Sequence, residues 1–376
     1  MAEIKDGAAG YPYSIRDIPI SDPFILADEA TGHYYTYVQF VDPERYPQLM
    51  TSEPCFYTMC SRDLINWTDP KICFRRGSFW GKEDYWAPEV HIWRGRYYLI
   101  SSFRAPGRVR ACQALVSDRP DGPFVPVGPE PLTPPGWQCL DGTLYVDSLD
   151  KPWLVFCHEW LQVYDGQICA IPLSEDLDRP VGKPVILFRA SDAPWRGNRP
   201  TDAGLVTDGP FLYRLPVKNY LPGHAASQEA RGGNSADGTL IMLWSSFSEH
   251  GGYTTGIARS MSGEITGPWI QDEVPLYALD GGHAMLFRTF TGQLMMSMHC
   301  PNIQERKRIL LFEMDENAQG LSIRNEVTGN WYDRAGGAAE NWRYQAPQEK
   351  RFYMATNPEL PGAKYVDADR QIRRFA

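Results

Sequence analysis

Four acidic side chains stand at the start of apolar, strand-like segments that lie far apart in the chain. They are Asp22 in SDPF, Glu89 in WAPEV, Asp141 in CLDGTL and Asp208 in VTDGPF. A fifth segment of the same kind, DGGHAM, carries His283 in place of a carboxylate. Carboxylates that meet at one place repel one another, and their pKa values are driven apart, unless they bind a cation. If the fold brings these segments together, the residue types therefore predict acid–base chemistry or cation binding.

The elements that carry these residues are predicted to be strands. Short β-rich runs alternate with turns of Gly, Pro, Asn and Asp, and helical periodicity is nearly absent. Hairpins begin near residues 22, 86, 141, 208 and 283, and most are followed by a third strand. Five units that each leave a sheet face uncovered favour an all-β, five-bladed β-propeller. A pair of packed sheets is the alternative, but it does not explain five restarts of one pattern.

The propeller is assigned to residues 1–316, and residues 317–376 to a short C-terminal extension that packs on or closes it. In a propeller the first strand of every blade lines the central channel. The five segments should therefore meet at one end of the axis.

Composition narrows the class of partner. The formal net charge of −9 argues against nucleic acid and anionic membranes, and no run of 18 or more apolar residues predicts a membrane span. The first ten residues, MAEIKDGAAG, do not read as a signal peptide, and the eight cysteines form no CxxC pair. We therefore expect reduced thiols in a cytoplasmic protein. With 12 Trp and 20 Tyr, the chain is rich in side chains that stack on small neutral substrates.

Longer motifs add a resemblance. Over roughly residues 15–316 the chain resembles glycoside hydrolase family 43 in SDPFIL, SRDLINWT, WAPEVHIWRGRYYL, LDGTLYVDSLDKPWLVF and TDGPFLYR. This resemblance implies a five-bladed propeller that removes arabinofuranosyl or xylosyl units from plant oligo- and polysaccharides with inversion. It also implies that Asp22 is the general base and that Asp141 orients the site and tunes its pKa values.

The general acid is less plainly assigned. The family usually has Glu before Gly-Pro on blade four, where this chain has Asp208, whose proton would fall about 1.5 Å short. Glu159 in FCHEW ends the second strand of blade three and is the other candidate. No cofactor is required for the chemistry. His283 resembles the family's axial histidine, which approaches a structural calcium ion through water, although a histidine buried in the core would fit the same position.

The remaining pocket residues are assigned from their places at strand ends. Trp86 offers a stacking face to a sugar or packs between blades, and Glu89 faces the channel or pairs with an arginine. His299, at the end of a second strand, is expected at the rim. Further substrate contacts are expected from His158, Trp160 and Arg288.

Two other functions fit the same segments. A propeller phosphorylase would need a cationic phosphate site, which Arg104, Arg108 and Arg110 on one hairpin would supply. A sugar-binding protein with impaired catalysis would explain Asp208 in place of Glu.

Overall fold

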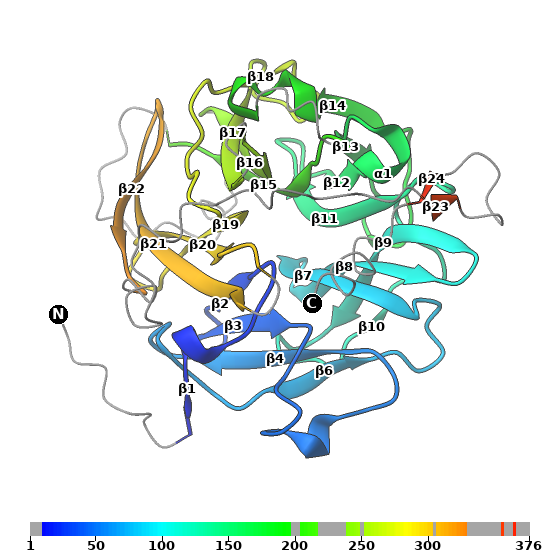
Figure 1. Ribbon diagram of the computed structural model, residues 1–376, viewed down its shortest axis with the longest axis vertical. Helices are drawn as coiled ribbons and strands as arrows, with labels where there is room; N and C mark the ends of the chain where they lie inside the picture. The colour runs from blue at the N-terminus through cyan, green and yellow to red at the C-terminus, as the bar shows by residue number, and fades with distance from the viewer. Residues whose placement is uncertain are drawn as a thin grey trace.

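The computed structural model describes residues 10–196, 204–216, 238–248, 252–303 and 306–328, together with two short strands further on. Strands dominate this part of the chain, and its single α-helix is one turn long, α1 (Trp160–Val163). Five sheets surround a central axis (Figure 1), so the predicted five-bladed propeller is confirmed. No helix among the described residues is long and apolar enough to cross a membrane.

Each blade is an antiparallel meander whose first strand faces the axis. Blade one contains β2 (Ile25–Asp28), β3 (His33–Val38), β4 (Cys55–Ser61) and β6 (Lys71–Arg75). Blade two contains β7 (Glu83–Trp93), β8 (Arg96–Ala105), β9 (Arg108–Ser117) and β10 (Val125–Pro126). Blade three contains β11 (Cys139–Val146), β12 (Pro152–His158), β13 (Gln167–Pro172) and β14 (Val185–Arg189). Blade four contains β15 (Asp208–Arg214), β16 (Leu240–Phe247), β17 (Tyr253–Ser260) and β18 (Trp269–Gln271). Blade five contains β19 (Gly282–Arg288), β20 (Leu294–Cys300), β21 (Arg308–Asn317) and β22 (Gly320–Glu326).

The predicted end of the propeller at residue 316 is too early, because β22 is the fourth strand of blade five. The turn into it is stabilised by Asn317, whose side-chain oxygen accepts hydrogen bonds from the backbone of Gln319 and Gly320. Beyond residue 328, β23 (Ala355–Thr356) pairs with β24 (Lys364–Tyr365). The rest of the predicted extension lies outside the described residues, so its packing stays a prediction.

Blades five and one are joined by the N-terminal segment. β1 (Tyr13–Ser14) pairs with β5 (Asn66–Trp67) at the outer side of blade one, and a 3-10 turn (Ile15–Asp17) follows. Ile20 then donates its backbone N–H to the carbonyl of Lys307 in blade five. These contacts hold together the two ends of the ring, which is also where Asp22 enters it.

The core lies between neighbouring blades. Apolar residues of blades two and three form one buried cluster, and those of blades three and four another. Trp67 and Trp244 are completely buried, and a Cβ at Gly256 would lie 2.3 Å from the ring of Trp195, so this strand must carry glycine there. All eight cysteines are free, and seven of them are buried, as expected for small apolar side chains in a packed interior.

Candidate active site

Near the start of the first strand of every blade lies the same backbone feature, a residue with left-handed φ. These residues are Asp22 (54°), Ala87 (48°), Asp141 (54°), Gly209 (51°) and His283 (55°). In blades two to five the pairing register shifts across this residue, which marks a β-bulge. A bulge turns a side chain away from the regular pleat, and left-handed non-glycine residues persist only where the surroundings hold them. The five blades therefore direct five equivalent residues to one end of the axis.

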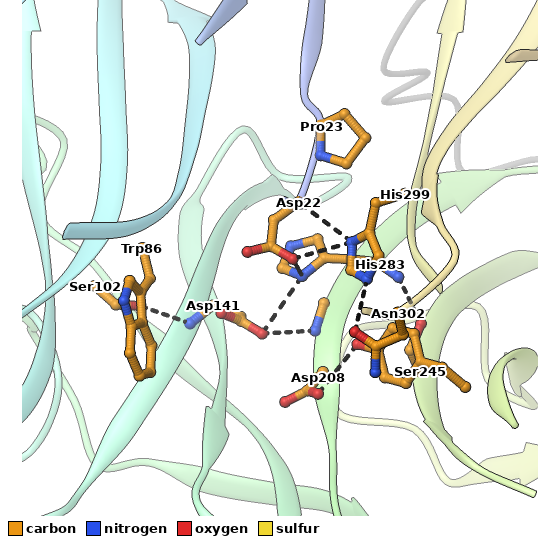
Figure 2. A network of polar contacts seen from close by, with 12 residues as sticks. Asp22, Pro23, Trp86, Ser102, Asp141, Asp208, Ser245, His283, His299 and Asn302 are labelled. Atoms are coloured by element: carbon orange, nitrogen blue, oxygen red, sulfur yellow. Dashed lines mark hydrogen bonds and ion pairs between the residues drawn. The ribbon is translucent and has the colours of Figure 1, made fainter. Parts of the chain in front are cut away.

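Side chains of the preceding blade hold three of these residues in place. The backbone N–H of Asp141 donates to Ser102 Oγ of blade two at 2.9 Å, and that of His283 to Ser245 Oγ of blade four at 2.9 Å. The N–H of Asp22 donates to Nδ1 of His299 in blade five at 3.2 Å. Figure 2 shows these contacts converging round the axis. Each acceptor lies on a second strand, so neighbouring blades build the site jointly.

His283 is the cation of the site. Its Nδ1 lies 3.2 Å from Asp22 Oδ1 and 3.7 Å from Asp141 Oδ2. Burial disfavours the charged imidazole, but the two carboxylates outweigh it and raise the pKa of His283 to about 10. In turn, burial disfavours a charge on Asp22, yet the imidazolium holds the pKa of that carboxyl well below its usual value. At neutral pH the pair is therefore an ionised Asp22 and a protonated His283.

Asp141 interacts with the same imidazolium at a longer distance than Asp22 does. It is buried, and its Oδ2 accepts the backbone N–H of Gly209 at 2.9 Å. Burial raises the pKa of Asp141 to about 6, the imidazolium of His283 opposing the rise and Asp22 adding to it. Asp141 thus links blades three, four and five through one carboxylate.

Asp208 does not occupy the position equivalent to Asp22, but stands one residue earlier, before the left-handed Gly209. A Cβ at Gly209 would lie 2.7 Å from Cγ of His283, so the imidazole excludes any side chain there. The carboxylate of blade four is consequently carried by residue 208. In Figure 2 the Asp22 and Asp208 carboxylates lie on either side of Asp141.

Asp208 has the electrostatics of a proton donor. Its burial among protein atoms, together with the neighbouring Asp141 charge, raises the pKa of the carboxyl to about 8, although part of the side chain still reaches solvent. Its Oδ2 accepts a hydrogen bond from the hydroxyl of Tyr253 at 3.1 Å. Tyr253 was not predicted as a site residue, because it is the first residue of a third strand and belongs to none of the motifs at the starts of first strands.

Glu159 belongs to a second network. Its Oε2 accepts hydrogen bonds from Arg110 and Gln138, both at 2.7 Å, and Arg110 also binds Asp84 at 2.7 Å. Oε2 of Glu159 is therefore already occupied by an arginine and an amide donor. The arrangement argues against Glu159 as proton donor.

The same arginine supports Trp86. The guanidinium carbon of Arg110 lies 3.9 Å from the centroid of the Trp86 ring, and Arg110 is 4 % exposed. Trp86 itself is half-buried and stands one residue before a left-handed residue, the same place that Asp208 has in blade four. Its indole is therefore held from one side by a buried cation.

Several predicted contacts are different in the structure. Glu89 pairs with His91 at 3.0 Å rather than with an arginine, since residues two apart on a strand share a face. Arg288 ends β19, whereas His283 is at its start, and it binds Tyr213 and Glu316, so its assignment to the substrate site is wrong.

The two remaining rim residues lie on blade three. His158 is buried against Trp137, with ring centroids 4.2 Å apart, and contacts Gln162 and Gln167. Burial lowers its pKa, so it is neutral. Trp160 is half-buried at the start of α1. Substrate contact by His158 or Trp160 stays a prediction.

The predicted phosphate site is not formed as expected. Arg104 pairs with Glu83 and Asp84, and Arg108 with Glu130. Arg110 is bound to Asp84 and Glu159, as described above. All three guanidinium groups of the hairpin are thus already matched by carboxylates.

A family model with the description glycosyl hydrolases family 43 matches residues 15–316. The chain belongs to this family. The match covers the innermost strands of all five blades and every residue of the axial site, from Asp22 to Asn302.

Individual relatives and solved structures are similar to this chain to different degrees. The crystal structure of an endo-arabinase from Bacteroides thetaiotaomicron VPI-5482 is 39% identical, with a TM-score of 0.69 over 81% of this chain and 97% of that one. An α-L-arabinofuranosidase from Lactobacillus brevis is 15% identical, with a TM-score of 0.58 over 84% and 96% of the two chains, which shows the fold alone. Xylosidase/arabinosidase 43A of Humicola insolens is 27% identical over 137 residues, which is 36% of each chain. That match spans about a third of the relative's length.

The residues of this family 43 site could contact a calcium ion only through water molecules. No group of three or more His, Cys, Asp or Glu among the described residues could hold a metal ion directly. Nε2 of His283 is buried and has no hydrogen-bond partner there, and a protonated nitrogen cannot be a ligand. Calcium takes six to eight oxygen ligands, so waters would have to supply most of them.

The raised pKa of Asp208 predicts that this residue destabilises the folded protein increasingly as pH rises. The pKa of this carboxyl is 3.8 in the unfolded state and about 8 in the folded state. Between these two pH values the folded state binds more protons at Asp208 than the unfolded state does, so the free energy of unfolding falls as pH rises. Asp208→Asn does not titrate. We expect its melting temperature to exceed that of the wild type by a margin that grows from pH 4 to pH 8. Differential scanning calorimetry over this range measures the margin.

The matched control is Asp118→Asn, which changes an exposed carboxylate paired with Arg96. Its margin should stay near zero throughout. A margin for Asp208→Asn that is independent of pH would mean that Asp208 titrates normally.

Proposed function

We propose that the protein is an inverting glycosidase that releases pentosyl units from plant oligo- or polysaccharides, and that α-L-arabinofuranosyl linkages are its substrates. The observation that carries the proposal is that His283 pairs with Asp22 and not with Asp208, so that the pKa is lowered at the first carboxyl and raised to about 8 at the second. Inverting glycosidases need such a pair, with a water between the base and the sugar. The 39% identical relative, named an endo-arabinase, supports arabinofuranosyl over xylosyl substrates.

In the proposed reaction Asp22 is the general base. It takes a proton from a water that attacks the anomeric carbon, while the protonated Asp208 gives its proton to the leaving oxygen and the glycosidic bond breaks. His283 keeps Asp22 ionised at the start of the reaction. Asp141 holds the Gly209 backbone beside Asp208 and, by its charge, keeps the proton on the acid until transfer.

Trp86 is proposed as the face on which a sugar ring stacks. Aromatic rings bind the apolar faces of sugars, and Arg110 behind the indole fixes its orientation. The alternative of a Trp packed wholly between blades fits less well, because Trp86 is only half-buried.

The base assignment is tested by Asp22→Asn. We expect kcat on arabino-oligosaccharides to fall by at least about a hundredfold, since general base catalysis typically contributes 10²–10⁴-fold. Proton NMR of the wild-type reaction should show that the first-formed sugar has the inverted anomeric configuration. A variant with undiminished kcat, or a retained configuration, would contradict the mechanism.

The acid assignment is read from leaving groups in the same assays. Asp208→Asn should lose about 10²–10⁴-fold on arabino-oligosaccharides but far less on nitrophenyl arabinofuranoside, whose leaving group needs little protonation. Glu159→Gln should lower both rates alike, because it removes one of the two carboxylates that hold Arg110 behind Trp86. Turnover that requires phosphate would instead indicate the phosphorylase, and arabinan binding without any released sugar would indicate the binding protein.

A structural calcium ion on the axis is also proposed, held mainly through water below His283. Treatment with a chelator should lower the melting temperature, and calcium chloride should restore it where magnesium chloride does not, because magnesium prefers a smaller octahedral site. Unchanged activity and melting temperature after chelation would rule out the ion.

A further inference from the structure

Tyr253 touches the proposed acid from a neighbouring strand. It is 3 % exposed, begins β17, and its hydroxyl donates to Oδ2 of Asp208 at 3.1 Å. Burial and the adjacent Asp208 raise the pKa of this phenol well above its usual value, so the hydroxyl remains a donor. Oδ1 of Asp208 has no hydrogen-bond partner among the described residues.

The surrounding residues are shaped to hold the Tyr253 ring. A Cβ at Gly282 would lie 2.3 Å from Cε1 of Tyr253, so blade five admits the ring only by carrying glycine. The backbone N–H of Tyr253 donates to Asp280 Oδ1 at 3.1 Å, and Asp280 Oδ2 accepts the N–H of Asn302 at 3.1 Å. Both the ring and the main chain of Tyr253 are thus fixed.

The ring also connects the acid with the base. It stacks on His299 with centroids 5.4 Å apart and planes at 10°. Nδ1 of His299 lies 3.2 Å from the backbone nitrogen of Asp22 and 3.3 Å from Asp22 Oδ1, and Nε2 lies 3.2 Å from Asn302 Oδ1. Burial lowers the pKa of His299 to about 4, so this ring is neutral. Tyr253 and His299 therefore form one rigid unit between Asp208 and Asp22.

We infer that Tyr253 is a positioning residue that places the acid proton on Oδ1 of Asp208. The hydroxyl of Tyr253 has a single hydrogen, which it donates to Oδ2 of Asp208. If the carboxyl proton of Asp208 were also on Oδ2, the two hydrogens would clash. The carboxyl proton is therefore on Oδ1 and passes from there to the glycosidic oxygen, which takes the bonding electron pair as the glycosidic bond breaks. The new carboxylate keeps its hydrogen bond from Tyr253, and that bond strengthens as the charge develops.

The inference rests on the proposed function and assigns a role that a merely structural tyrosine would not have. Tyr253→Phe keeps the ring and its stacking but removes the donor. We expect kcat on arabino-oligosaccharides to fall about 10- to 100-fold, as for loss of a hydrogen bond to a charged group, with KM little changed. The nitrophenyl substrate should lose much less. The alkaline limb of the kcat/KM profile should move to higher pH, because the carboxylate loses a stabilising donor.

The matched control is Tyr277→Phe. This half-buried tyrosine belongs to the same region, packs on Phe312, and its hydroxyl contacts only the sulfur of Cys300, at 3.8 Å, among the contacts described. It should leave kcat, leaving-group dependence and the alkaline limb near wild type.

A double-mutant cycle separates this inference from the proposed function. Adding Tyr253→Phe to Asp208→Asn should cause no further leaving-group-dependent loss, because both changes act on one proton. If Tyr253→Phe leaves the leaving-group dependence and the alkaline limb unchanged while Asp208→Asn alters them, the role of Tyr253 is wrong and the acid assignment stands. If Asp208→Asn alters neither, the acid assignment itself fails, and the inference with it.

Discussion

The imidazolium of His283 is the one positive charge that interacts with the three carboxyls Asp22, Asp141 and Asp208 at the propeller axis among the contacts described. The different pKa values of the three carboxyls follow from their unequal interaction with it. His283 lies closest to Asp22, next to Asp141, and Asp208 has no charged partner of opposite sign among the contacts described. The pKa values follow the same order, well below normal at Asp22, about 6 at Asp141 and about 8 at Asp208. A single cation placed off-centre is thus enough to separate the pKa values of carboxyls of identical chemistry.

The backbone makes that placement. Left-handed residues at the five strand starts are costly for any residue but glycine, and side chains from the preceding blade stabilise three of them. Because Ser102, Ser245 and His299 come from second strands, the geometry of each functional residue depends on how two blades pack. Formation of the ring and formation of the active site are therefore one event, which suits a fold whose blades cannot bury their faces alone.

Sequence reasoning predicted which residues meet at the axis but not how they are arranged there. The repeated strand starts were enough to predict that Asp22, Asp141, Asp208 and His283 meet, since the first strands of a propeller share an axis. The extra residue between Asp208 and its Pro-Phe, compared with SDPF, marks a one-residue offset in the sequence, but the imidazole of His283 that fills the space beside Gly209 could not be foreseen. Arg288 was placed wrongly, because strand direction decides which end of β19 faces the substrate. Partners of Glu89 and Glu159, and the contact from Tyr253, depend on side-chain packing across blades that no local motif records.

The central claim is that Asp208 is protonated and Asp22 ionised in the resting protein at neutral pH. Infrared spectroscopy of the wild type and variants at pH 7 tests it most directly, because a protonated carboxyl has a carbonyl stretch that is separate from carboxylate bands. The account predicts a protonated-carboxyl band that disappears in Asp208→Asn and persists in Asp22→Asn. Loss of the band in Asp22→Asn instead, or its persistence in Asp208→Asn, would contradict the assignment of acid and base.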